Sequence, residues 1–173
     1  MEKIRLRSLT QTDIETTLAW HNQEDISDLY SGHPFPVNIE MEEKWYKKIL
    51  TSNFPVTVFG VERTDNQKLI GITLLKDINM INRSAEFALY IGEINERGQG
   101  FAKEALKKTL NFGFFKIGLN RITLKVLQEN ETAIQLYQSA GFIKEGTLRK
   151  NVFKNNKFKD EILMGILKEE FNG

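Results

Sequence analysis

Alternation of apolar and polar residues predicts the strands of this chain. The segment EKIRLRSL at 2–9 alternates with period two, which favours a first strand. Apolar or alternating runs at 54–63, 68–79, 84–91, 120–127, 141–153 and 157–167 predict the others. The pair Asn155-Asn156 lies between the last two runs, where it predicts a hairpin turn.

Helical spacing appears between these strands. The first helix is expected to begin at Thr10 or Thr12, both good caps, and to end at His21. Further helices are expected at 39–51, about 100–116 and 129–140. Gly141 suits the C-terminal cap of the last helix. We therefore predict a mixed α/β (α+β) chain that forms a single domain over 1–173.

Composition narrows the class of protein. The chain has 173 residues, 40% hydrophobic, with a net charge of +1, as expected of a globular domain without nucleic acid as its main partner. The sequence contains no cysteine and two histidines, so neither a thiolate nor a histidine-rich metal site is expected. No apolar run suggests a membrane span and no segment resembles a secretory signal, so we expect a cytoplasmic protein.

Charge is distributed unevenly along the chain. Residues 8–43 contain eight acidic side chains and no Lys or Arg, whereas residues 144–159 contain six basic side chains. Such segments are often solvated faces of a protein. They also fit an acidic mouth for a cationic substrate and a basic side for a phosphorylated one.

The segment NERGQGFAKEAL, residues 95–106, joins a predicted strand to a predicted helix. A helix N-terminus presents free backbone N–H groups, and glycines before it allow the backbone to close around an anion. Arg97 adds a positive charge beside Gly98 and Gly100. The same segment also fits a tight strand-to-helix turn, and its spacing matches neither a P-loop nor a full dinucleotide-binding fingerprint.

Two motifs together resemble a known family. Arg97-Gly98-Gln99-Gly100-Phe101-Ala102 is similar to the pyrophosphate loop of the GNAT family of acetyl-CoA-dependent N-acetyltransferases. Downstream, Asn130 to Tyr137, followed by Gly141-Phe142, resembles the second motif of that family. Ser84 to Phe87 and the final hairpin resemble the branch that contains ribosomal-protein and spermidine acetyltransferases.

The resemblance implies a GNAT fold and a mode of cofactor binding. It implies a mixed, mostly antiparallel sheet of about seven strands, splayed between strands 4 and 5 and flanked by about four helices. Acetyl-CoA is the implied co-substrate, and no metal is expected. The expected cofactor-binding residues are Leu89, Tyr90, Ile91, Arg97, Gly98, Gln99, Gly100, Phe101, Ala102, Asn130 and Tyr137.

Tyr137 matches the general acid of the family. Acetyl transfer from a thioester to an amine releases a thiolate, and a tyrosine hydroxyl, with a pKa of about 10, can protonate it. In a helix, Ala133, Tyr137 and Ala140 share one face, on which the small alanines allow close approach of a ligand. The alternative is a tyrosine of the core whose hydroxyl has a partner in the protein.

Glu86 interrupts an apolar strand and is the candidate base or acceptor-binding carboxylate. Partial burial is expected to raise its pKa, which suits a base. The alternative is a solvent-facing glutamate or one paired with Arg83 or Arg121, with a chain of water molecules accepting the proton.

Several polar residues after the first helix are candidates for contact with the acceptor. Glu24, Asp25, Asp28 and His33 lie where this family often binds its acceptor, although they also fit ordinary surface positions. His21 and His33 are further acid–base candidates because their reference pKa lies near neutrality. Spermidine enzymes of the family have an acidic pair in the loop where this chain reads LYSGHP at 29–34.

The sequence therefore predicts an N-acetyltransferase that moves an acetyl group directly from acetyl-CoA to a primary amine. The acceptor is a polyamine, diamine or aminosugar, or a peptide N-terminus, and a homodimer stays open as the assembly. Two alternatives remain: a non-catalytic acyl-CoA-binding module, and a nucleotide or phosphosugar binder.

Overall fold

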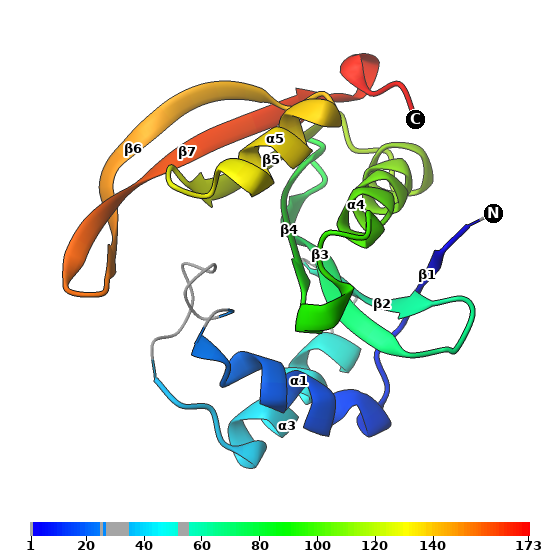
Figure 1. Ribbon diagram of the computed structural model, residues 1–173. Coiled ribbons are helices and arrows are strands. Elements are labelled where there is room, and N and C mark those ends of the chain that lie inside the picture. Colours follow the sequence, from blue (N-terminus) through cyan, green and yellow to red (C-terminus); the bar gives the residue numbers. More distant parts are fainter. Residues whose placement is uncertain (1, 25, 27–34, 52–55) are drawn as a thin grey trace.

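A seven-stranded sheet forms the centre of the molecule (Figure 1), with strand order β1-β2-β3-β4-β5-β7-β6. The computed structural model describes residues 2–24, 26, 35–51 and 56–173. The strands are β1 (Ile4–Arg7), β2 (Thr57–Arg63), β3 (Leu69–Asn79), β4 (Ser84–Ile91), β5 (Arg121–Leu127), β6 (Ile143–Lys154) and β7 (Lys157–Leu167). Among these described strands, only β4 and β5 pair in parallel, so the sheet is mixed and mostly antiparallel, which confirms the prediction.

The sheet splays between β4 and β5. The two strands pair only from Ser84 to Glu86 and from Arg121 to Thr123. Beyond this point β4 continues to Ile91 beside β3, and β5 continues to Leu127 beside β7. The expected splay is confirmed, and it leaves one edge of each strand unpaired within the sheet.

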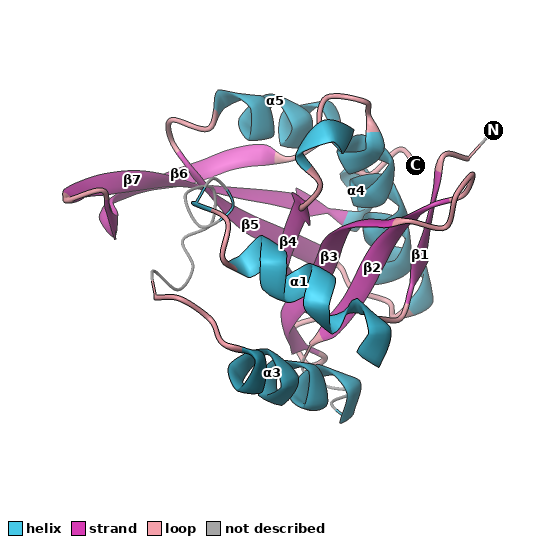
Figure 2. Ribbon diagram, turned by 60° about the horizontal axis from the view of Figure 1, so that its bottom comes forward, coloured by secondary structure: helices cyan, strands magenta, loops and turns pink. Residues whose placement is uncertain are grey.

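Helices cover the two faces of the sheet (Figure 2). The described residues form four α-helices: α1 (Ile14–His21), α3 (Ile39–Thr51), α4 (Phe101–Asn111) and α5 (Glu131–Ser139). On one face, Trp20 of α1 and Tyr46 of α3 pack with Ile72 of β3. On the other face, Phe87 of β4 packs with Leu106 of α4. None of the described helices is both long and apolar enough to cross a bilayer.

Alternation along β4 distributes its side chains between these faces. Phe87 and Leu89 belong to the core beneath α4 and α5. Tyr90 packs with the core beneath α1 and α3. Tyr90 and Phe87 therefore lie on opposite faces of the strand whose edge is open.

The fourth predicted helix differs at its end. A single helix was expected to reach about residue 116, but α4 ends at Asn111 and one π-helical turn, Phe112–Lys116, follows. This turn brings the backbone of Gly113 against the sheet, where an added Cβ would lie only 2.8 Å from Cδ1 of Ile122. This close approach needs a residue without a side chain.

The last two strands form a long hairpin. Asn155 and Asn156 have φ angles of 49° and 57°, as a type I′ turn requires. The predicted hairpin is thereby confirmed. Phe153 and Phe158 flank this turn with ring centroids 5.0 Å apart, and both are exposed.

Candidate active site

The glycine loop opens onto the N-terminus of α4. Gly98 and Gly100 have φ angles of 76° and 87°, which glycine adopts readily, and a Cβ at either position would meet no atom within 4 Å. The bond from Glu104 N to Gly100 O, 3.2 Å long, begins the helix. The amides ahead of it have no partner within the helix, so they are available to an anion.

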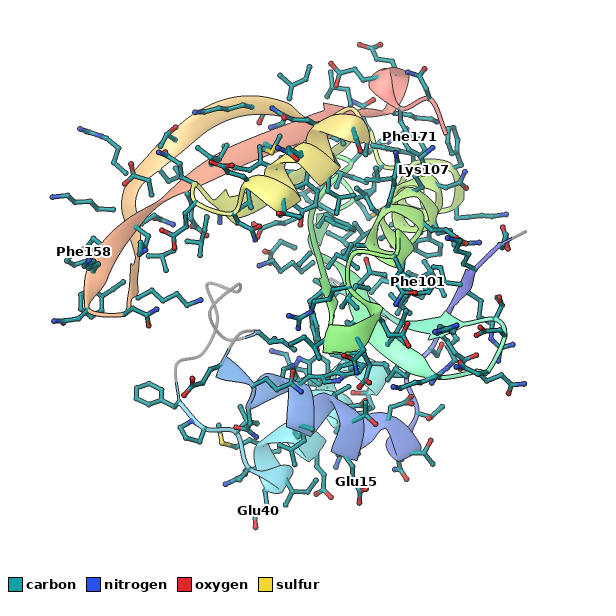
Figure 3. The ribbon with its side chains drawn as sticks, viewed as in Figure 1. Glu15, Glu40, Phe101, Lys107, Phe158 and Phe171 are labelled. Carbon is teal, nitrogen blue, oxygen red and sulfur yellow. The ribbon has the colours of Figure 1, made fainter. Side chains whose placement is uncertain are left out.

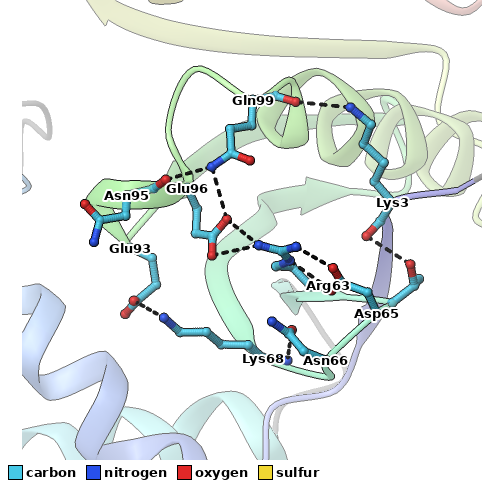
Figure 4. A network of polar contacts seen from close by, with 10 residues as sticks. Lys3, Arg63, Asp65, Asn66, Lys68, Glu93, Asn95, Glu96 and Gln99 are labelled. Carbon is cyan, nitrogen blue, oxygen red and sulfur yellow. Dashed lines mark hydrogen bonds and ion pairs between the residues drawn. The ribbon is translucent and has the colours of Figure 1, made fainter.

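Side chains beneath the loop fix its shape (Figure 4). The Arg63 guanidinium donates to both carboxylate oxygens of Glu96, at 3.0 and 2.9 Å. The side chain of Gln99 turns back and donates to the carbonyl of Asn95 at 2.7 Å. Gln99 thus stabilises the loop with its side chain, and its backbone amide is the group left for the expected cofactor contact.

Arg97 links the loop to the end of β4. Its Nε donates to the backbone carbonyl of Ile91 at 2.9 Å. Phe101, the first residue of α4, is buried, and the Arg63 guanidinium lies 5.4 Å from the centre of its ring. Phe101 and Ala102 therefore offer backbone amides rather than polar side chains to a ligand.

Loss of the Glu96 carboxylate should loosen this loop. Glu96→Gln removes the negative charge of a buried side chain to which the Arg63 guanidinium donates two hydrogen bonds. We expect acetyl-CoA affinity to fall by about fivefold in equilibrium titration. Asp65→Asn is the matched control, because Asp65 pairs with the same guanidinium but is exposed and lies outside the loop. Equal losses in the two variants would contradict a specific role of Glu96.

The unpaired edge of β4 presents backbone groups next to this loop. Gly92 N donates to the carbonyl of Ile70 on β3. In an antiparallel pair every second residue is hydrogen-bonded to the partner strand, so Tyr90 and Ala88 also direct their N–H and C=O groups toward β3. The intervening residues, Leu89 and Ile91, direct their N–H and C=O groups to the opposite edge. The Ile91 carbonyl is occupied by Arg97 there, which leaves the polar backbone groups of Leu89 for an extended ligand.

Tyr137 lies on α5, which covers the same face of the sheet as α4. Its ring contacts Phe87 edge-on, with centroids 6.2 Å apart, and lies 5.8 Å from the ring of Phe142. No hydrogen bond to its hydroxyl is found among the described residues, and burial raises the pKa of Tyr137 to about 12. The hydroxyl therefore stays protonated at neutral pH, as a general acid must.

Asn130 fixes the start of α5. Its Oδ1 accepts a hydrogen bond from the amide of Ala133 at 3.1 Å and so caps the helix. The expected contact with the cofactor would therefore come from the Nδ2 group. Ala133 and Ala140 pack against the core beside Tyr137, as their helical spacing predicted.

The expectation for Glu86 was wrong in one respect. Its carboxylate lies 2.8 Å from the Lys76 ammonium and 3.4 Å from that of Lys125. Partial burial acts to raise the pKa of Glu86, but the hydrogen bond and charge of Lys76, together with those of Lys125, outweigh it and lower that pKa. Glu86 is therefore a poor base. The alternative of a salt-bridged glutamate is confirmed, with Lys76 and Lys125 as the partners in place of Arg83 or Arg121. Arg121 pairs with Glu145 instead.

The acidic candidates on the acceptor side are only partly described. Glu24 is exposed just after α1, whereas Asp25, Asp28 and His33 lie outside the described residues. Glu15 and Glu40 point outward from α1 and α3 (Figure 3). The hypothesis of one continuous acidic mouth therefore gains no support from these two residues. On the opposite side, Lys107 donates to the carbonyl of Gly173 at 2.9 Å, so it is engaged by the C-terminus.

A polar cluster on the face of α1 and α3 was missed from the sequence. Glu42 of α3 is 1% exposed and bonds His21 of α1. His21 in turn lies 3.3 Å from the hydroxyl of Tyr90. A signal was available, because Glu42 stands on the helical face of α3 that also contains Ile39, Tyr46 and Ile49. A carboxylate on an apolar stripe indicates a buried partner.

Comparison with known proteins assigns this arrangement to a family. The GNAT acetyltransferase domain model matches residues 3–143. A spermidine N(1)-acetyltransferase of Vibrio cholerae serotype O1 is 34% identical, over 98% of this chain and 95% of its own. The spermidine N(1)-acetyltransferase of Escherichia coli K12 is 29% identical, over 97% of this chain and 88% of its own.

A solved structure extends the match to the whole fold. The crystal structure of the Vibrio cholerae spermidine N-acetyltransferase in complex with CoA and spermine superposes with a TM-score of 0.92. It is 31% identical and covers 99% of each chain. Two sequence motifs, the splayed sheet and these full-length matches agree. The chain belongs to the GNAT family of acetyl-CoA-dependent N-acetyltransferases.

Proposed function

We propose that this enzyme acetylates a polyamine of the spermidine class. The observation that supports this most is the near-complete superposition on a spermidine N-acetyltransferase in complex with CoA and spermine. The similarity covers both the cofactor motifs and the segments that precede them, because it extends over 99% of this chain. A small, flexible, cationic amine is also compatible with the acidic balance of residues 8–43.

The cofactor side of the proposal uses groups already described. The free amides from Gly98 to Ala102 would bind the pyrophosphate, and the backbone of Leu89 would pair with the pantetheine arm. Acetyl-CoA supplies a thioester, which the amine attacks directly. Tyr137 would then donate its phenolic proton to the departing sulfur.

The acceptor side involves carboxylates. Glu24 would contact an ammonium group from the end of α1, with Asp25, Asp28 and His33 as further candidates outside the described residues. Glu86 would bind an ammonium by exchanging it for Lys76 or Lys125, whose side chains are 45% and 40% exposed. The missing acidic pair at 29–34 makes a direct test of polyamines necessary.

The test is thiol release from acetyl-CoA by the purified protein with a panel of amines. The panel contains spermidine, spermine, diamines, aminosugars and peptides with free N-termini. We expect the highest kcat/KM with spermidine or spermine. Preference for an aminosugar or a peptide would contradict the proposed acceptor class but leave the assignment as an N-acetyltransferase intact. Sedimentation of the same sample would test a homodimer, and fractionation of the source cells would test a cytoplasmic location.

A further inference from the structure

Four side chains from three different elements form a continuous polar chain. The Tyr90 hydroxyl of β4 lies 3.3 Å from His21 Nε2 of α1. His21 Nδ1 lies 2.7 Å from Glu42 Oε2 of α3. Thr17 Oγ1 donates to the other oxygen, Oε1, of Glu42 at 2.6 Å. Both oxygens of Glu42 are thus engaged, and the imidazole of His21 is held at both nitrogens.

The side chains of this hydrogen-bonded series are buried to different extents. Glu42 and Thr17 are buried, whereas the side chain of His21 is 26% exposed and Tyr90 is partly exposed. A buried carboxylate is costly unless it is paired with hydrogen-bond donors or a positive charge. The hydrogen bonds from His21 and Thr17 supply these partners for Glu42. The outer end of the polar chain is the hydroxyl of Tyr90, a residue of β4.

The hydrogen bonds define which group can accept a proton. Glu42 is an acceptor, so neutral His21 carries its proton on Nδ1, and Nε2 accepts from the hydroxyl of Tyr90. Burial, together with the nearby Glu42 and Tyr46, raises the pKa of Tyr90 well above its usual value. Tyr90 thus keeps its proton at neutral pH, and Nε2 of His21 is the atom to which its hydroxyl is hydrogen-bonded.

The position of Tyr90 complements that of Tyr137. Tyr137 packs with Phe87 and Phe142 on the face of α4 and α5. The ring of Tyr90 packs against Trp20 of α1 on the other face, with centroids 5.9 Å apart. The two rings therefore pack on opposite faces of the sheet, and β4 has an open edge beyond Glu86. A thioester bound along that edge would have a proton donor on one face and a proton acceptor on the other.

We propose that Tyr90, His21 and Glu42 form a proton relay that deprotonates the acceptor's ammonium group. One ammonium proton moves to the Tyr90 oxygen as the Tyr90 proton moves to His21 Nε2. The neutral amine then attacks the acetyl carbon, and His21 later releases its proton to water. Glu42 acts as a positioning residue. The relay rests on the proposed function, because it needs a cationic amine as the acceptor.

Other charged groups near His21 are accounted for by partners of their own. Glu93, which accepts from the indole of Trp20, pairs with Lys68. Asp13, which acts on Tyr46, pairs with Arg7. Among the described residues, Glu42 and Tyr90 contact the imidazole of His21 directly. Tyr46, Asp13 and Glu93 are further away and act through Thr17, Tyr46 and Trp20, respectively. Glu42 is the carboxylate among them that contacts the imidazole.

The pH dependence of His21→Gln tests the relay. Glutamine preserves hydrogen bonds to Glu42 and Tyr90 but accepts no proton at these pH values. With the best amine of the panel, we expect kcat/KM at pH 7 to fall about 30-fold. The deficit should shrink to less than about threefold near pH 10, where much of an alkylamine, with a pKa of roughly 10, is already neutral. A purely structural defect would lower activity equally at all pH values.

Two further variants give a matched comparison. Tyr90→Phe keeps the ring on Trp20 and removes the hydroxyl, so it should reproduce the pH-dependent loss. Tyr46→Phe removes a hydroxyl that contacts Thr17, at the far end of the cluster from β4. It should leave the pH profile of the wild type unchanged. Circular dichroism and acetyl-CoA affinity would verify that each variant is folded.

The outcomes separate the two proposals. A pH-independent loss in His21→Gln, or an unchanged profile in Tyr90→Phe, would overturn the relay and leave the proposed function intact. Absence of turnover by the wild-type protein with every amine of the panel would overturn both.

Discussion

Replacing Tyr137 with phenylalanine should lower kcat by on the order of 10²-fold. The substitution keeps the ring that packs between Phe87 and Phe142 and removes only the hydroxyl. The thiolate would then leave without a proton donor, whereas the contacts that bind acetyl-CoA would remain. Steady-state kinetics with spermidine and an equilibrium titration of acetyl-CoA measure the two effects separately.

The pH profile adds a second check on Tyr137. Because burial raises the pKa of Tyr137 to about 12, its acid form should persist throughout the neutral and mildly alkaline range. Ionisation of Tyr137 should therefore cause no fall in the kcat of the wild-type enzyme between pH 7 and 10. If the kcat of Tyr137→Phe at neutral pH equals that of the wild-type enzyme, Tyr137 is not the general acid.

Gly100→Val should abolish acetyl-CoA binding, with affinity reduced by more than about 10²-fold. Gly100 has a φ of 87°, and a β-branched residue adopts such a conformation only at a cost of roughly 1–3 kcal/mol. The added side chain would also occupy the open space in front of the α4 amides. Backbone strain and steric exclusion therefore act on the same anion-binding groups. Isothermal titration measures the loss directly.

Gly118→Val is the matched control for this variant. Gly118 has a φ of 75° and open space around an added Cβ, but it lies between the π-helical turn and β5. It should cost comparable stability in thermal unfolding and leave acetyl-CoA affinity nearly unchanged. Normal binding by Gly100→Val would mean that the loop is only a strand-to-helix turn.

Local pattern was sufficient for most of the fold. The strand at 84–91 and the helix at 39–51 were predicted with the observed bounds, because their periodicity and flanking residues agree. The end of α4 was not predictable. The π-helical turn contains Gly113, where the chain passes close to Ile122 of β5, and local helical propensity does not reveal such a long-range approach.

The candidate site was predictable where its residues are adjacent in sequence. The loop from Arg97 to Ala102 and the helix that contains Tyr137 follow from contiguous motifs. The state of Glu86 does not, because Lys76 comes from β3 and Lys125 from β5. Opposite charges on neighbouring strands reversed the pKa shift that burial alone would give.

The contact of His21 with Tyr90 was also beyond local pattern, since it joins positions 69 residues apart. Long-range polar contacts require the arrangement of elements before their partners can be identified. His21 could be identified from the sequence as an acid–base candidate, but its two partners, Glu42 and Tyr90, could not.

The divergence of β4 and β5 has a consequence for the free enzyme. Strand edges without partners exchange their amide hydrogens readily and can pair with other chains. A ligand that pairs with Leu89 would act as a substitute strand inside the sheet. Acetyl-CoA should therefore protect the Leu89 amide from hydrogen exchange and, at 100 times its Kd, stabilise the folded chain by about 2.7 kcal/mol. Without acetyl-CoA, the edge of β4 would be exposed, and the enzyme would aggregate more readily than it does with acetyl-CoA bound.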